Sequence, residues 1–139
     1  MEAVPLVVET SFDVRYAETD AMGIVHHSAY IVWFEEGRSA WFRERLADRR
    51  GYALVEDEGT FFAVTDVNAR YVAAARYGDR VCVRTWISAV RSRGMTVSYR
   101  VSNGTTGQLL CKGQTTHVCL DQDSRVVAIP VHWAAQLLS

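Results

Sequence analysis

The stretch AYIVWFEEGRSAWFRERLAD, residues 29–48, decides the fold class. Its apolar side chains recur at i, i+3, i+4 and i+7, which is the periodicity of one face of an α-helix. Ile31 and Val32 fall outside that face, so we expect the first turns of the helix to be buried nearly all round. Gly37 costs a helix about 1 kcal/mol relative to alanine. Its place in the middle therefore indicates a close approach to a sheet.

The segment before this helix and most of the chain from residue 61 on show the two-residue alternation of β-strands. FDVRYAET (12–19) precedes the helix, and RRGYALVEDEGT (49–60) after it resembles a loop. Strands are then expected at 61–72, 80–90, 95–101 and 108–120, with a hairpin signal at Asn103-Gly104, and a short helix near 131–138. This order predicts a single α+β domain, residues 1–139, in which a curved antiparallel β-sheet wraps around one long central α-helix.

Composition restricts the class of protein. Of the 139 residues, 49% are hydrophobic and 22% charged, as in soluble globular proteins. A net charge of −1 argues against a dedicated nucleic-acid partner. The segment MEAVPLVVET has no basic start, and no apolar run reaches membrane-spanning length. We therefore expect no membrane partner and a cytoplasmic location, where the three cysteines (Cys82, Cys111 and Cys119) stay reduced and structural.

Asp20 stands shortly before the helix, in ETDAMGIVHH (18–27). A helix start offers unpaired backbone N–H groups and partial positive charge, which stabilise a developing oxyanion. Gly23 allows a tight turn between the acid and the helix. A carboxylate facing such donors acts as general base on water or attacks a carbonyl itself. An acid before a helix is more often a cap or a partner of the helix dipole, so residue types alone leave both roles open.

Other chemistries fit these residues less well. Asp20, His26 and His27 do not have metal-ligand spacing, because adjacent histidines splay apart. We therefore expect no metal and no organic cofactor. No serine lies in a nucleophile elbow, and no cysteine lies near a base in sequence. His117 is expected to be a satisfied structural residue, and Glu35 a solvated or interface charge.

The segment YAETDAMGIVHHSAYIVWFEEGRSAWF (16–42) resembles the signature of hotdog-fold acyl-CoA thioesterases of the 4-hydroxybenzoyl-CoA thioesterase family. The family pattern is Y-x-x-x-D-x-x-G-h-V-x-[HYF]-x-x-[YF], where h is apolar. FFAVTDVNARYVAAARYGDRVCVRT (61–85) is similar to the strand pair of the family, with Ala74 in place of a common proline. The similarity extends from about Val8 to Pro130. The residues that match the signature are Tyr16, Asp20, Gly23, Val25, His27 and Tyr30.

The resemblance implies a hotdog fold and a catalytic carboxylate at Asp20. It also implies that the backbone N–H of His27 polarises the thioester carbonyl and that Tyr16 lines the site. Gly23, Val25 and Tyr30 would then belong to the substrate-binding site. Ala29 stands where many relatives have asparagine, which removes a polar group near the site. Some relatives use a helix glutamate instead, which makes Glu35 the alternative acid.

The implied reaction is hydrolysis of an acyl-CoA or an acyl carrier protein thioester by a homodimer that assembles into a homotetramer. A non-catalytic acyl-CoA-binding hotdog protein is the alternative function. Hydratase-type relatives have a histidine about five residues after the acid, where this chain has Val25, so hydration is disfavoured. Arg91 and Arg93 lie in a turn and either bind CoA phosphates or remain solvated.

Overall fold

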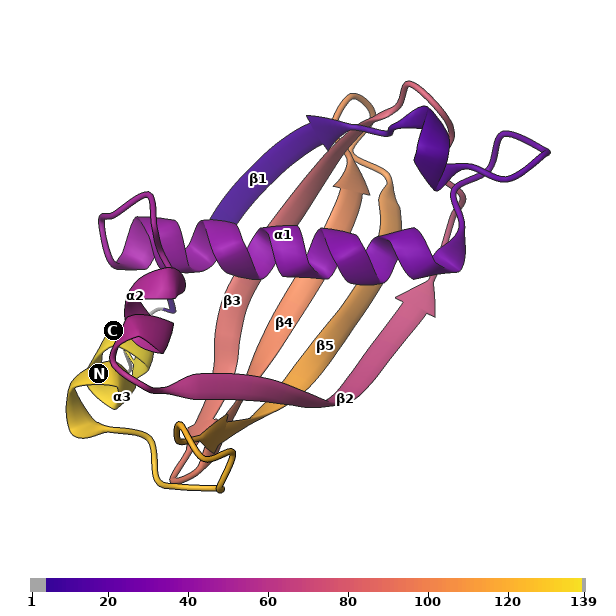
Figure 1. Cartoon of the computed structure of the whole chain (residues 1–139). Coiled ribbons are helices and arrows are strands. Elements are labelled where there is room, and N and C mark those ends of the chain that lie inside the picture. The colour runs from indigo at the N-terminus through magenta and orange to yellow at the C-terminus, as the bar shows by residue number, and fades with distance from the viewer. Residues whose placement is uncertain (1–4, 139) are drawn as a thin grey trace.

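One five-stranded antiparallel sheet forms the body of the molecule, in a computed structural model that describes residues 5–138 (Figure 1). The strand order is β1-β3-β4-β5-β2, and each neighbouring pair is antiparallel. The strands are β1 (Val8–Asp13), β2 (Phe61–Tyr71), β3 (Arg80–Arg91), β4 (Gly94–Asn103) and β5 (Leu109–Leu120). The long helix α1 (His27–Arg45) crosses one face of this sheet. The predicted curved sheet around one central helix is confirmed.

Helix α1 begins two residues before the predicted start and ends three residues before the predicted end. It ends early because Ala47 has a φ of 52°, a left-handed conformation that cannot continue an α-helix. The residues that face the sheet are buried: Tyr30, Trp33, Phe34, Gly37, Trp41 and Phe42. The expectation that the first turns are buried nearly all round is wrong for one copy of the chain. Val32 is 43% exposed, because it points away from the sheet.

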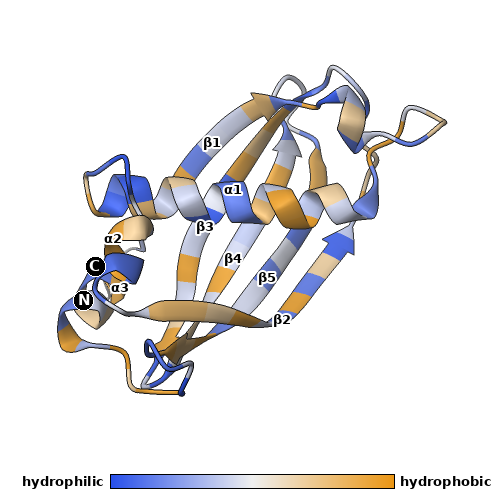
Figure 2. Ribbon diagram, in the orientation of Figure 1, coloured by the Kyte–Doolittle hydropathy of each residue, from blue (hydrophilic) through white to orange (hydrophobic). Residues whose placement is uncertain are grey.

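Gly37 confirms the predicted close approach of helix and sheet. A Cβ atom built there would collide with Thr85 Oγ1 and lie 3.0 Å from Val83 Cγ1. On β3, Val81, Val83, Thr85 and Ile87 are buried and alternate with exposed or half-buried residues. Figure 2 shows the same mixture of hydrophobic and hydrophilic residues along the strands behind α1. The core therefore lies between α1 and the sheet.

Three details differ from the predictions. The strand expected over residues 12–19 is β1, which ends at Asp13, and Tyr16–Glu18 form a 3-10 helix instead. The segment expected as a loop contains a short helix, α2 (Ala53–Asp57), and the strand after it starts at Phe61. The Asn103-Gly104 hairpin is longer than a two-residue turn, because the Asn103 side chain accepts hydrogen bonds from the N–H groups of Thr105 and Thr106. The C-terminal helix α3 (Val131–Leu138) confirms the prediction.

The first four residues of the N-terminal segment considered above lie outside the described residues. Within residues 5–138, no helix is both long and apolar enough to cross a membrane.

Candidate active site

Asp20 lies in a tight loop that projects between the 3-10 helix η1 (Tyr16–Glu18) and α1 (Figure 1). Its backbone N–H donates to the carbonyl of Ile24 at 2.8 Å, and its carbonyl accepts from the N–H of Gly23 at 3.0 Å. Gly23 has a φ of 76°, which a residue with a side chain rarely adopts. The glycine therefore has the turn-forming role that the sequence predicted.

The carboxylate of Asp20 also closes this loop. Its Oδ1 accepts hydrogen bonds from the N–H groups of Met22 at 2.8 Å and Ile24 at 3.2 Å. These hydrogen bonds, first that of Met22 and then that of Ile24, lower the pKa of the Asp20 carboxyl below its usual value. Asp20 is exposed, and its Oδ2 makes no hydrogen bond within the described chain. The loop thus holds an ionised carboxylate with one oxygen free for chemistry.

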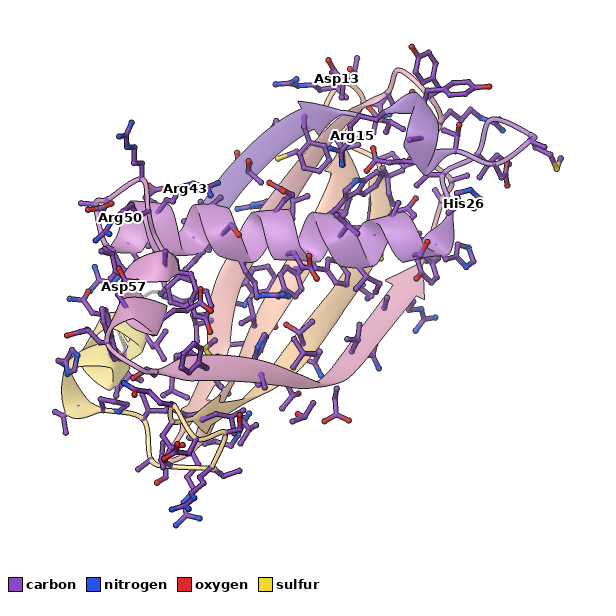
Figure 3. The ribbon with its side chains drawn as sticks, in the orientation of Figure 1. Asp13, Arg15, His26, Arg43, Arg50 and Asp57 are labelled. Carbon is purple, nitrogen blue, oxygen red and sulfur yellow. The ribbon has the colours of Figure 1, made fainter. Side chains whose placement is uncertain are left out.

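His27 is the first residue of α1, and the extended residue His26 precedes it without a side-chain cap. Figure 3 shows His26 at this end of the helix, near the end of β2. The N–H groups of His27 and Ser28 donate no hydrogen bond to any atom of residues 5–138. Unpaired N–H groups and the helix dipole favour negative charge here. The helix start therefore has unpaired N–H donors at His27, the residue to which the resemblance assigns the polarising N–H.

Tyr71, at the end of β2, fixes this first turn of the helix. Its ring stacks on the His27 imidazole, with 3.9 Å between ring centroids and 11° between planes. Its hydroxyl donates to the carbonyl of His27 at 3.1 Å. No local sequence pattern indicates this pair, because 44 residues separate Tyr71 from His27. Tyr71 positions the helix start on which the proposed oxyanion site depends.

A cavity of about 200 Å³ opens beside this pair, and we call it the helix-start cavity. Val25 and Tyr30, both assigned to substrate binding from the sequence, are among its lining residues. The Tyr30 hydroxyl accepts from the N–H of Ala75 at 3.3 Å, so its ring is fixed in place. The lining residues are Ile24, Val25, His27, Tyr30, Tyr71, Val72, Ala73 and Ala74.

The other predicted site residues are more dispersed. The Tyr16 ring is 77% exposed and packs edge-on against Tyr77, with 5.7 Å between ring centroids. Arg91 and Arg93 lie at the turn between β3 and β4, whereas the loop of Asp20 contacts the chain near Arg76, just before β3. The length of β3, Arg80–Arg91, separates them by roughly 36 Å at about 3.3 Å per residue. One copy of the chain does not bring these arginines to Asp20.

Glu18 is a second acid that residue types alone did not single out. Its Oε2 accepts a hydrogen bond from Trp33 Nε1 at 2.6 Å and is 3.0 Å from Arg15 Nη2. Burial acts to raise the pKa of Glu18, but the hydrogen bonds from Arg15 and Trp33 outweigh it and lower the pKa. The backbone carbonyl of Glu18 accepts from the N–H of His26 at 2.9 Å. Glu18 therefore anchors the segment that carries Asp20 onto α1.

A second cavity, of about 220 Å³, lies between α1 and β2, and we call it the helix–β2 cavity. It is lined by Glu35, Arg38, Ser39, Phe42, Tyr52, Phe62, Met95 and His117. Glu35 lies eight residues after His27, which places it about 12 Å along the helix. The alternative acid thus faces a different cavity from the helix start.

A chain of buried hydrogen bonds ends on His117 at the wall of this cavity. Arg38 Nη1 donates to the Tyr99 hydroxyl at 3.0 Å, Tyr99 contacts Thr115 Oγ1 at 2.7 Å, and Thr115 contacts His117 Nε2 at 2.7 Å. A guanidinium can only donate, so the Tyr99 hydroxyl accepts from Arg38. The His117 tautomer sets the direction of the other two hydrogen bonds. Among the described residues, His117 Nδ1 has no hydrogen-bond partner of standard geometry. The expectation of a satisfied histidine therefore holds for one ring nitrogen only.

The other reactive side chains fit structural roles. Burial raises the pKa of the Cys111 thiol to about 11, and it raises the pKa of Cys119 as well. Thiols with a raised pKa are poor nucleophiles. No group of three or more His, Cys, Asp or Glu side chains in residues 5–138 is arranged to hold a metal ion.

Known proteins share this sequence and architecture. The family model of the thioesterase-like superfamily matches residues 14–137. YneP of Bacillus subtilis is 36% identical over 118 residues, which cover 85% of this chain and 83% of YneP. The acyl-CoA thioester hydrolase YbgC of Escherichia coli O6:H1 is 30% identical and matches over 78% of each chain.

The crystal structure of the hypothetical protein TT1821 from Thermus thermophilus superimposes with a TM-score of 0.84 at 40% identity. The match covers 94% of this chain and 98% of TT1821. The family model covers α1 and the strands β2 to β5, which are four of the five strands of the sheet. The chain therefore belongs to the thioesterase-like superfamily, whose hotdog fold it adopts.

Proposed function

We propose that this protein hydrolyses acyl-CoA thioesters at the start of α1. The observation that carries the proposal is the pairing of two features within one short segment. The first is the ionised carboxylate of Asp20, whose Oδ2 accepts no hydrogen bond from residues 5–138. The second is the pair of N–H groups at His27 and Ser28, beside the helix-start cavity, which have no acceptor in the described part of the chain. The acyl-CoA substrate is suggested by the name of the relative YbgC.

In the proposed reaction the thioester carbonyl oxygen accepts a hydrogen bond from the N–H of His27. As the carbonyl carbon becomes tetrahedral, negative charge develops on that oxygen and is stabilised by the helix start. Asp20 either removes a proton from the attacking water or attacks the carbon itself to form an anhydride that water then cleaves. The C–S bond breaks, the thiolate leaves and takes up a proton, and the carboxylic acid is released. Both routes consume one water.

We further propose that two copies of the chain assemble around a two-fold axis and complete the site. The loop of Asp20 projects from the molecule, and Asp20 is not among the residues that line the helix-start cavity. Strand β2 lies at one edge of the sheet, and Val64 and Val67 on it are each 45% exposed. An open edge of this length is a liability that pairing with a second copy removes. A tetramer would pair two such dimers.

The test is a thiol-release assay over aryl, short-chain and long-chain acyl-CoA thioesters, run with and without a chelator. Release of thiol from at least one substrate, unaffected by the chelator, is the expected result. Binding of acyl-CoA without thiol release would favour the non-catalytic alternative. Loss of activity on chelation would mean that a metal takes part. Light scattering at micromolar protein tests the assembly, because a monodisperse monomer would contradict a site completed by a second copy.

A further inference from the structure

Four cationic side chains form one straight row across the sheet face that points away from α1. Arg70 on β2 pairs in register with Lys112 on β5, Lys112 pairs with Arg100 on β4, and Arg100 pairs with Arg84 on β3. All four are exposed, whereas the neighbouring residues Cys111, Val101 and Val83 are buried under α1. Strands lie about 4.8 Å apart, so the row is about 15 Å long. We call it the cation row.

Most of the cation row has no counter-charge. Arg84 Nε lies 3.3 Å from Glu9 Oε1, but within the described chain the side chains of Arg70, Lys112 and Arg100 form no ion pair and no hydrogen bond. Like charges directly opposite each other on neighbouring strands destabilise a sheet. Cations often protect an edge strand from aggregation. Lys112 and Arg100 lie on interior strands, however, so edge protection does not account for them.

The cation row borders a hollow of about 330 Å³ on the same face. The next row in register places Asn68, Gln114, Ser98 and Trp86 side by side, and all four line the hollow. Every lining residue belongs to the sheet, so no other element covers the hollow. Small-ligand sites enclose most of their ligand. This hollow is uncovered, is bordered by cations and has Trp86 in its lining, so it is better suited to contact with a larger partner than to a small ligand.

We propose that the cation row is the docking site for an acidic helix of a carrier protein that presents the acyl thioester. Acidic side chains at i, i+3 and i+4 on a helix are about 5–6 Å apart, which matches the step between strands. The cationic surface is one row wide. On the far side of the hollow, the next row on the same face carries an acid, Asp66, which is in register with Thr116. A single helix fits this width better than a nucleic-acid backbone, which needs several phosphate contacts.

The cation row also begins next to the helix-start cavity, where a docked carrier would have to deliver its thioester. This step of the argument rests on the proposed function. Arg70 directly precedes Tyr71, whose ring stacks on His27 and lines the helix-start cavity. Val72, Ala73 and Ala74 continue the wall of that cavity. The end of β2 therefore carries the docking cation on one face and the candidate site on the other. The flexible arm of a docked carrier would pass around this strand end to reach the site.

The experiment measures the affinity of fluorescently labelled holo-acyl carrier protein by anisotropy, with wild-type protein and charge-reversed variants. Lys112→Glu and Arg100→Glu should each weaken binding about tenfold or more, because like charges then meet across the interface. Arg49→Glu is the control: it makes the same charge change away from the row, at an exposed residue that forms no ion pair with residues 5–138. Equal affinity for wild type and both row variants would overturn the proposal. Tighter binding of a short DNA duplex, lost in the same variants, would also overturn it.

A kinetic experiment separates this proposal from the proposed function. Lys112→Glu should lower kcat/KM for an acyl carrier protein thioester, mainly through KM, and leave hydrolysis of the matched acyl-CoA unchanged. Docking sensitive to the row with no hydrolysis of either thioester would refute the proposed function while the docking site stands. Hydrolysis of both thioesters with no effect of Lys112→Glu would refute the docking site while the function stands.

Discussion

The buried histidine on β5 predicts a specific loss of stability at acidic pH. His117 is 3% exposed, and its pKa is lowered to about 4. Burial is the largest cause, and the positive charge of Arg38 adds to it, while the backbone of Phe62 acts weakly in the opposite direction. The unfolded chain binds a proton near pH 6.5 and the folded chain does not, so stability rises with pH in this window. The stability that neutral His117 contributes to the folded state is therefore fully present above pH 6.5 and is lost as the pH falls towards 4.

The size of this loss follows from the two pKa values. A shift of one pKa unit corresponds to about 1.4 kcal/mol, so the full difference between 6.5 and about 4 amounts to about 3 kcal/mol. About 2 kcal/mol of this is lost by pH 5. With a urea m-value of about 2 kcal/mol/M, the unfolding midpoint should fall by about 1 M between pH 7.5 and pH 5.

The assay compares urea unfolding of wild type and His117→Gln at both pH values. Glutamine cannot titrate, so the variant should lack this part of the pH dependence even if it is less stable overall. The measured quantity is the difference between the two proteins in the pH dependence of the unfolding midpoint. The other titrating groups are common to both proteins, so their contributions cancel. Parallel profiles for the two proteins would refute the reasoning. An imidazole NMR titration that placed the pKa of His117 near 6.5 in the folded protein would refute it as well.

Two further predictions concern the stability of the sheet and of α1. Gly37→Ala should destabilise the protein by about 1–3 kcal/mol in urea unfolding, because the added Cβ would collide with Thr85 Oγ1. The gain in helix propensity, about 1 kcal/mol, offsets this loss only in part. An unchanged midpoint would show that Thr85 moves aside without cost. Lys112→Glu should instead stabilise the protein by about 0.2–1 kcal/mol per cross-strand pair, since Arg70 and Arg100 flank residue 112 in register. A lower urea-unfolding midpoint would mean that repulsion within the cation row does not destabilise the sheet.

Much of the fold was predictable from local patterns. The spacing of Trp33, Phe34, Gly37 and Trp41 fixes which side of α1 faces the sheet, and the structure places all four against it. The helix α2 was missed because its five residues, ending at Asp57, are too few to show a period. Its start has no side-chain cap that could mark it in the sequence.

Features that depend on pairing between distant segments were not predictable. The contact of Tyr71 with His27 and the hydrogen-bond chain that ends on His117 both join residues from different elements. The cation row exists only because the register of four strands aligns side chains such as Arg70 and Lys112. Local periodicity carries no information on register. The turn at Gly23 and the start of α1 near His27 were predictable, because both depend on residues close together in sequence. The strand expected to reach Thr19 was wrong, since Tyr16–Glu18 form a 3-10 helix.

The most direct test of the account is the rate of thioester hydrolysis by Asp20→Asn. The asparagine side chain keeps the oxygen that accepts from Met22 and Ile24 but has no negative charge. Loss of a general base typically lowers the rate by about 10²–10⁴-fold, and the loss should fall on kcat rather than on KM. Asp123→Asn, at another exposed acid, is the matched control and should remain active. His27→Ala should have a milder effect, because it keeps the backbone N–H. Near-normal turnover of Asp20→Asn, together with an inactive Glu35→Gln, would contradict the account and assign the catalytic acid to the helix–β2 cavity.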